Sequence, residues 1–152
     1  MSGFVGERFL KRIWMAHGGT GSGESKSNPL PLASGDLWAI PAGTEIEKVS
    51  FLEVVAIGGT TDVDIGDDDA AAGYVDGSVS LNVGTPGLYS NNAKVAGSYL
   101  RVETAGATDS ADVYVVPTTK YYAAAGKELK AAVTGASSAG EVCVIVEGKN
   151  LG

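Results

Sequence analysis

The fold of this chain is decided by the stretch Glu45-Ile-Glu-Lys-Val-Ser-Phe-Leu-Glu-Val-Val-Ala-Ile57, which is followed at once by Thr61-Asp-Val-Asp-Ile65. Side chains alternate across a β-strand, and the first run carries apolar residues on one face at period two, with Leu52 and Val54 on the other. It therefore predicts a long strand that is covered on both sides over part of its length. The second run alternates Val and Ile with Asp, the pattern of a half-buried strand. The link Gly58-Gly-Thr60 tolerates positive φ, so we expect a tight hairpin between the two strands.

The rest of the chain repeats this scheme of short strands between Gly, Asp and Ser turns. Further strands are expected at 36–40, 98–103, 111–116, 119–123, 128–134 and 141–147. Strands of this number, at roughly ten-residue spacing, predict an all-β fold, a two-sheet sandwich over residues 29–152. Its expected core includes Val49, Phe51, Val55, Val63, Ile65, Leu100, Val102, Val113, Val115, Val133, Val144 and Val146.

Composition narrows the class of protein. The chain of 152 residues most simply forms one domain, and its 22 glycines favour turns and strands over long helices. The single cysteine, Cys143, excludes an internal disulfide. The sequence has no run of 18 apolar residues that would cross a membrane, and Arg8, Lys11 and Arg12 interrupt any signal-peptide core. We therefore expect a soluble protein made in the cytoplasm, with no membrane partner.

The net charge of −7 is unevenly distributed. Residues 1–27 hold four basic and two acidic residues, which gives +2, and the remainder holds seven basic and sixteen acidic residues, which gives −9. An acidic body repels phosphate groups, so no nucleic-acid partner is expected.

Residues 1–28 are expected to form an N-terminal arm and tether, because residues 18–28 are rich in Gly and Ser, a flexible composition. The apolar residues before the tether are candidates for a partner interface: Phe4, Phe9, Leu10, Ile13, Trp14 and Met15. The alternative, which stays open, is a first strand or helix packed on its own domain. We favour the flexible or extended arm that docks on another subunit.

Two segments invite a ligand-binding interpretation. The Gly-rich run resembles a phosphate-binding loop, but Glu24 and Ser25 separate its last Gly from Lys26, so nucleotide binding is not expected. The acidic run offers Asp64, Asp67 and Asp69 as candidate calcium ligands. The EF-hand spacing fails there, and a solvated turn whose carboxylates cap local amides is favoured. We expect no metal and no cofactor.

The inventory for catalysis is small. His17 is the only histidine and lies in the expected tether, and Cys143 lies in a strand that is apolar on both faces, so neither is placed for catalysis. A carboxylate pair in a cleft is not located by the sequence. The chain is therefore expected not to be an enzyme. Five tyrosines have two alternative interpretations. They could form a surface on which a carbohydrate stacks, but such residues more often cover sheet faces and subunit interfaces. They are Tyr89, Tyr99, Tyr114, Tyr121 and Tyr122.

Three segments together resemble the head decoration, or cement, proteins of tailed bacteriophages. They are Ser34-Gly-Asp-Leu-Trp-Ala-Ile-Pro-Ala-Gly-Thr-Glu-Ile-Glu-Lys-Val49, the acidic turn and Gly-Tyr loop Asp64-Ile-Gly-Asp-Asp-Asp-Ala-Ala-Ala-Gly-Tyr-Val-Asp-Gly77, and the closing hairpin within residues 127–147. The resemblance implies a jelly-roll-like domain on the outer capsid surface of a virion, with the major capsid protein and sister copies (a dimer or trimer) as partners. It implies binding that cements neighbouring capsid subunits, not catalysis. The alternative is a carbohydrate- or receptor-binding β-sandwich module of a virion fibre or baseplate.

Overall fold

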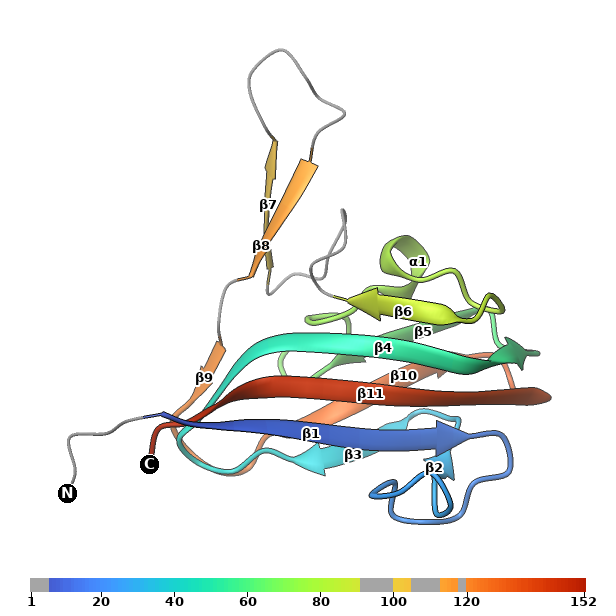
Figure 1. The fold of residues 1–152 in the computed structure, drawn as a ribbon, viewed down its shortest axis with the longest axis horizontal. Coiled ribbons are helices and arrows are strands. Elements are labelled where there is room, and N and C mark those ends of the chain that lie inside the picture. The colour runs from blue at the N-terminus through green and yellow to red at the C-terminus, as the bar shows by residue number, and fades with distance from the viewer. Residues whose placement is uncertain (1–5, 91–99, 105–112, 118–119) are drawn as a thin grey trace.

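The computed structural model describes residues 6–90, 100–104, 113–117 and 120–152, which are built mainly of β-strands (Figure 1). Gly87–Ser90 is a strand, at a position where no strand was expected, and Gly77–Ser80 forms a one-turn helix capped by Asp76. No helix in this part of the chain is long and apolar enough to cross a membrane. The elements are β1 (Glu7–Ala16), β2 (Leu30–Pro31), β3 (Gly35–Ala39), β4 (Thr44–Gly58), β5 (Asp62–Gly66), α1 (Gly77–Ser80), β6 (Gly87–Ser90), β7 (Leu100–Thr104), β8 (Val113–Pro117), β9 (Lys120–Tyr122), β10 (Glu128–Thr134) and β11 (Ala139–Asn150).

The strands form two facing sheets and a separate two-stranded ribbon. The larger sheet has the order β2-β1-β11-β4-β6, with β9 also paired to β4, and the smaller has the order β3-β10-β5. The ribbon consists of β7 and β8. Figure 1 shows the long strands β1, β11 and β4 side by side, with β3, β10 and β5 in a second layer. This confirms the expected all-β, jelly-roll-like sandwich of two sheets.

The expected hairpin between β4 and β5 is wrong, because the chain passes from the larger sheet to the smaller one at this point. The same holds for β10 and β11, which pair with β5 and β4 respectively. The two crossovers lie side by side: Ser138 N donates to Gly58 O at 2.8 Å and Thr61 N to Thr134 O at 2.9 Å. One antiparallel ribbon is thus folded over a corner into both sheets. Turn composition and strand alternation are the same on either path, so the sequence did not separate them.

The N-terminal segment differs from the expected detached arm. Residues 7–16 are strand β1, paired with β11 in an unbroken antiparallel register from Glu7–Asn150 to Ala16–Glu141. Two inward side chains, Ile13 and Met15, are 1% and 0% exposed, and their burial holds the strand on the sandwich. The following Gly-rich loop is closed by main-chain hydrogen bonds, among them Trp14 N to Gly23 O at 2.7 Å. The folded domain therefore begins at β1 and not at residue 29.

The core lies between the two sheets. Six of the expected core residues are fully buried there: Val49, Phe51, Val63, Ile65, Val144 and Val146. Val55 is not, since it is 47% exposed. The reason is an irregularity in the pairing of β4 with β11 between Glu141 and Val142, which breaks the strict alternation of faces. Val133 is partly buried, and the side chains of Leu100, Val102, Val113 and Val115 lie outside the described residues.

Candidate docking surface

The candidate site is the outer face of the larger sheet, the face turned away from the core. Side chains that are paired across antiparallel strands lie on the same face. The register pairs Trp14 with Cys143, Cys143 with Leu52, and Leu52 with Leu88. Their neighbours in the next register position, Ile13, Val144 and Phe51, are buried in the core, so this row points outward. Four strands therefore carry one apolar row across the outside of the sheet.

The row continues into two exposed valines at the irregular part of β4. Val54 and Val55 are 36% and 47% exposed, and Leu88 is 64% exposed. Cys143, at the middle of the row, is 1% exposed although it lies on the outer face, because larger side chains surround it. We call this set the apolar patch: Trp14, Leu52, Val54, Val55, Leu88 and Cys143. No described element of the chain packs over it as a further layer.

A buried carboxylate holds the patch in shape from beneath. Glu53 is 2% exposed and accepts hydrogen bonds from Ile57 N at 3.2 Å and Gly84 N at 3.3 Å. The first bond fixes the irregular stretch that presents Val54 and Val55. The second fixes the turn that precedes β6, the strand that carries Leu88. A carboxylate acceptor is stronger than a neutral one, so Glu53 is well suited to tie these two segments together.

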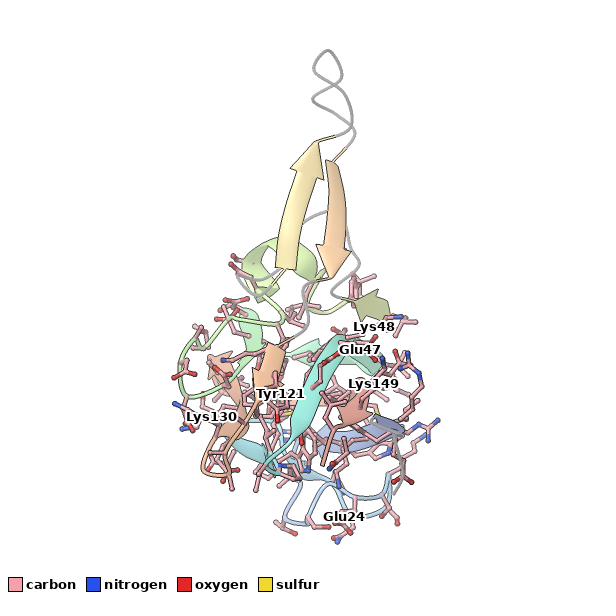
Figure 2. The ribbon with its side chains drawn as sticks, turned by 90° about the vertical axis from the view of Figure 1, so that its left-hand side faces the viewer. Glu24, Glu47, Lys48, Tyr121, Lys130 and Lys149 are labelled. Atoms are coloured by element: carbon pink, nitrogen blue, oxygen red, sulfur yellow. The ribbon has the colours of Figure 1, made fainter. Side chains whose placement is uncertain are left out.

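The other half of the outer face is charged. Glu47 accepts from Arg8 at 2.6 Å and lies 3.9 Å from Lys149 Nζ. Tyr121 of β9, 53% exposed, lies in the same register row as Glu45 and Lys149. Figure 2 shows Glu47, Lys48 and Lys149 close together, with Lys130 on the opposite side of the molecule. The outer face thus combines an apolar half with a half of mixed charge.

The loop after β1 contacts one end of the patch. Lys26 Nζ lies 5.9 Å from the centre of the Trp14 ring and 3.6 Å from a carboxylate oxygen of Glu141. A cation over an indole contributes about 0.5–1 kcal/mol at an exposed site. The contact lies beside Trp14, which is partly buried.

No protein-family model matches the chain, and no curated protein matches it in sequence. Among solved structures it is similar to a chain of the cyanophage Pam1 capsid asymmetric unit, with a TM-score of 0.56 and 14% identity over 98% of this chain and 89% of that one. A chain in the acidic stable capsid structure of Helicobacter pylori bacteriophage KHP30 is also similar, with a TM-score of 0.49 and 16% identity over 96% of this chain and 90% of that one. The likeness is one of fold.

The residues expected to form a partner interface are divided between the two faces of β1. Ile13 and Met15 are in the core and cannot reach a partner, and Phe9 is half-buried against Trp38, with 5.6 Å between the ring centres. Leu10 and Trp14 are on the outer face, and Phe4 lies outside the described residues. The prediction therefore found one patch residue, Trp14. It missed Leu88, because a single leucine between Gly and Tyr carries no periodic signal.

The acidic turn after β5 is a network of ion pairs. Asp67, 3% exposed, caps Asp69 N and Ala70 N at 2.9 and 3.1 Å and also accepts hydrogen bonds from Lys120 and Tyr122. Asp69 pairs with Lys127 at 2.7 Å, and Asp68 pairs with Lys130 at 2.6 Å. The expected capping is confirmed, but the turn is tied to β9 and β10 by lysines and is not simply solvated.

The three candidate calcium ligands each have partners within the chain. Asp64 accepts from Gly77 N at 2.8 Å, whereas Asp67 and Asp69 both pair with Lys120 and Asp69 pairs also with Lys127. The described residues contain no group of three or more carboxylate, histidine or cysteine side chains that could hold a metal ion. The hydrogen bond from Lys130 lowers the pKa of Asp68, and that from Lys127 lowers the pKa of Asp69. Burial raises the pKa of Asp64, and the nearby charges of Asp62 and Asp76 add to the effect.

The other residues considered from the sequence have structural surroundings. His17 Nδ1 lies 3.0 Å from Ser137 Oγ on the exposed surface between two loops. Burial raises the pKa of the Cys143 thiol, which keeps it protonated. Tyr122 is buried and Tyr89 is packed against the core, so neither ring offers a free face for stacking on a sugar. The side chains of Tyr99 and Tyr114 lie outside the described residues.

Proposed function

We propose that this chain is a non-enzymatic virion structural protein that binds the outer surface of a phage capsid and cements neighbouring capsid subunits. The apolar patch on the outer face of the larger sheet is the observation that carries the proposal. Two other observations support it. The three sequence segments resemble phage decoration proteins, and the chain shares its fold, along almost its whole length, with a chain of a capsid asymmetric unit.

The patch is suited to docking on another protein. Fully burying a Val or Leu side chain is worth about 1.5–3 kcal/mol, so covering Leu88, Val54 and Val55, each about half exposed, contributes on the order of 1 kcal/mol apiece. Trp14 adds a large aromatic ring, the kind of residue that most often anchors an interface. The mixed charges around Glu47 form a polar rim, which gives orientation more than affinity.

The charge distribution favours this face over the opposite one. Besides the buried Asp67, seven acidic side chains lie on or next to the smaller sheet, and in the described part of the chain Lys120, Lys127 and Lys130 offset them there. Docking through the outer face leaves this acidic side in water, so the carboxylates are not desolvated and no free-energy cost arises from them. The seven acidic residues are Asp36, Asp62, Asp64, Asp68, Asp69, Asp76 and Glu128.

The mechanism is binding linkage. A protein that binds assembled capsid better than free subunits stabilises the assembled state by RT ln(1 + [L]/Kd). A site that spans two capsid subunits has this property, because the site exists only after assembly. No bond is made or broken, and none of the chain's titratable groups has to act as acid or base.

The test is binding to virions that lack the protein. Purified chain is mixed with such particles, bound chain is measured by co-sedimentation, and cryo-EM locates it. Leu88→Glu and Val55→Glu should each weaken binding tenfold or more, because a carboxylate would be buried in the contact. Ala124→Glu, an exposed position in the loop after β9, is the matched control and should bind normally. Equal binding by all four proteins, or density away from the outer capsid surface, would refute the proposal.

A further inference from the structure

Strand β1 has a free edge. It pairs with β11 on one side, and on the other side β2 pairs only with Met15 and Ala16. Trp14 N donates away from β11 to Gly23 O, and Ala16 O accepts from Leu32 N at 3.0 Å. Main-chain groups alternate in direction along a strand, so those of Arg8, Leu10 and Arg12 also point to the free edge. Within the described residues no main-chain partner reaches these three.

The same edge of the sandwich is open between the sheets. Beyond β1 the larger sheet contains only the two-residue strand β2, and β3 is the edge strand of the smaller sheet. Phe9 of β1 and Trp38 of β3 pack together at this opening, with ring planes tilted by 53°. Both rings are only partly buried. An edge with free hydrogen-bonding groups beside a half-covered aromatic pair is the arrangement used for strand addition by a partner.

We propose that β1 pairs antiparallel with β1 of a second copy of this chain, about a twofold axis at Phe9. Residues that lie opposite each other on antiparallel strands point to the same face of the sheet. The twofold axis must therefore pass through a residue and not between two residues. Centred on Phe9, the register sets Glu7 opposite Lys11 twice and Arg8 opposite Leu10. The main-chain groups of Arg8 and Leu10, which face the free edge, then bond to each other across the axis.

Charge selects this register over its neighbours. An axis at Leu10 would set Arg8 opposite Arg12, and an axis at Lys11 would set two lysines face to face, and like charges directly opposite are destabilising. Cationic edges usually prevent pairing. Here Arg8 is already neutralised by Glu47 at 2.6 Å, and Lys11 gains Glu7 of the second copy in addition to its distant contact with Glu24 at 4.0 Å.

The pairing joins two larger sheets into one continuous sheet and places both apolar patches on the same side of it. A dimer of this kind presents two docking surfaces in one direction. That consequence for cementing rests on the proposed function, whereas the pairing itself is a property of the isolated chain.

The test uses charge reversal in the full chain. The unmodified protein should form a dimer in sedimentation-velocity ultracentrifugation. Glu7→Lys and Lys11→Glu should each weaken the dimer roughly tenfold, because each sets like charges opposite one another twice. An equimolar mixture of these two variants should form a mixed dimer, visible by native mass spectrometry, because every pair across the axis is then Lys with Glu. A monomeric unmodified protein, unchanged dimerisation of the single variants, or a mixture that does not pair more tightly than either variant alone would overturn the proposal.

A second variant removes the hydrogen bonds and leaves the charges. Leu10→Pro deletes an N–H that points to the free edge and so breaks no bond within the chain, since Pro is tolerated on edge strands in this orientation. It should be folded by circular dichroism and monomeric. A folded Leu10→Pro protein that still dimerises would overturn the proposal. If that variant is unfolded, the mixed-dimer experiment decides alone.

Discussion

The phenol of Tyr122 donates a hydrogen bond to the buried carboxylate of Asp67, with 2.6 Å between the two oxygens. The Tyr74 hydroxyl lies 2.7 Å from that of Tyr122, and Lys120 also donates to Asp67. Burial raises the pKa of Tyr122, and the hydrogen bond to Asp67 raises it further, so the phenol stays a donor at all ordinary pH values. This cluster fixes β9, which re-enters the larger sheet after the β7–β8 ribbon, to the turn after β5.

Replacing Tyr122 by Phe should destabilise the protein by about 1–3 kcal/mol, because the buried carboxylate loses one of its donors. The measurement is the free energy of unfolding from urea denaturation. Tyr121→Phe is the matched control, since that neighbouring phenol is 53% exposed, and it should change stability by less than about 0.5 kcal/mol. Equal effects of the two substitutions would show that the Asp67 cluster does not stabilise the fold.

The corner where the ribbon passes between sheets depends on glycine. Gly59 has φ +77°, and a Cβ there would lie 2.3 Å from Ala136 O of the adjacent crossover. Gly59→Ala should therefore cost more than the roughly 1–3 kcal/mol of a strained backbone conformation alone. Gly18→Ala separates the two causes, because Gly18 has φ +74° with nothing within 4 Å of a Cβ. Thermal unfolding should rank Gly59→Ala as clearly the less stable of the two; the reverse order would contradict the side-by-side crossovers.

Asp64 and Asp68 should give pH dependences of opposite sign. Burial raises the pKa of Asp64, so the folded protein binds its proton more tightly than the unfolded chain, and the charged form opposes folding at neutral pH. Asp64→Asn keeps the acceptor for Gly77 N and should raise the melting temperature at pH 7. This gain should shrink as pH falls through the raised pKa of folded Asp64 and vanish below the unfolded value near 4.

Asp68 is the opposite case, because the hydrogen bond from Lys130 lowers its pKa. Its contribution to stability is present above the unfolded value near 4 and is lost as pH falls through the folded pKa. Asp68→Asn should lower the melting temperature at pH 7 and have a smaller effect at pH 3, where the carboxylate begins to be protonated in the folded protein as well. Melting curves from pH 3 to 7 compare the two variants, and shifts of the same sign at pH 7 would contradict the assigned environments.

The sequence predicted elements better than their pairing. Alternation over 128–134 and 45–57 located β10 and β4, because period-two patterns report which residues are covered. The pattern carries no information on which strand lies beside which, so the crossovers at Gly59 and Gly135 were expected to be hairpins. In the same way the Gly-rich loop 18–28 was expected to be flexible, although its main-chain hydrogen bonds close it on β1.

The candidate site was predicted less well than the fold, for a related reason. The apolar patch is assembled from four strands, with three residues from β4 and one each from β1, β6 and β11, so no single segment of the chain shows it as a motif. Val54 and Val55 appear core-like by composition, and only the irregular pairing opposite Glu141 brings both to the surface. Trp14 was identified because it is large and apolar near the N-terminus. The same prediction wrongly assigned its buried neighbours Ile13 and Met15 to that surface.

The clearest test of the N-terminal strand compares two residues of β1 that point to opposite faces. Ile13 is 1% exposed and packs in the core, whereas Leu10 is 47% exposed on the outer face. Ile13→Ala should lower the free energy of unfolding by about 2–5 kcal/mol, since it removes buried methyl groups and leaves a cavity. Leu10→Ala should change it by less than about 1 kcal/mol, because most of that side chain is already in water. Denaturant unfolding at a protein concentration low enough to keep the chain monomeric measures both values.

Small and equal effects would mean that the segment is a detached arm, as the sequence alone suggested, and would remove β1 from the folded domain. A loss at Ile13 alone would establish the strand, because only a residue packed between the sheets is sensitive to the methyl groups it buries.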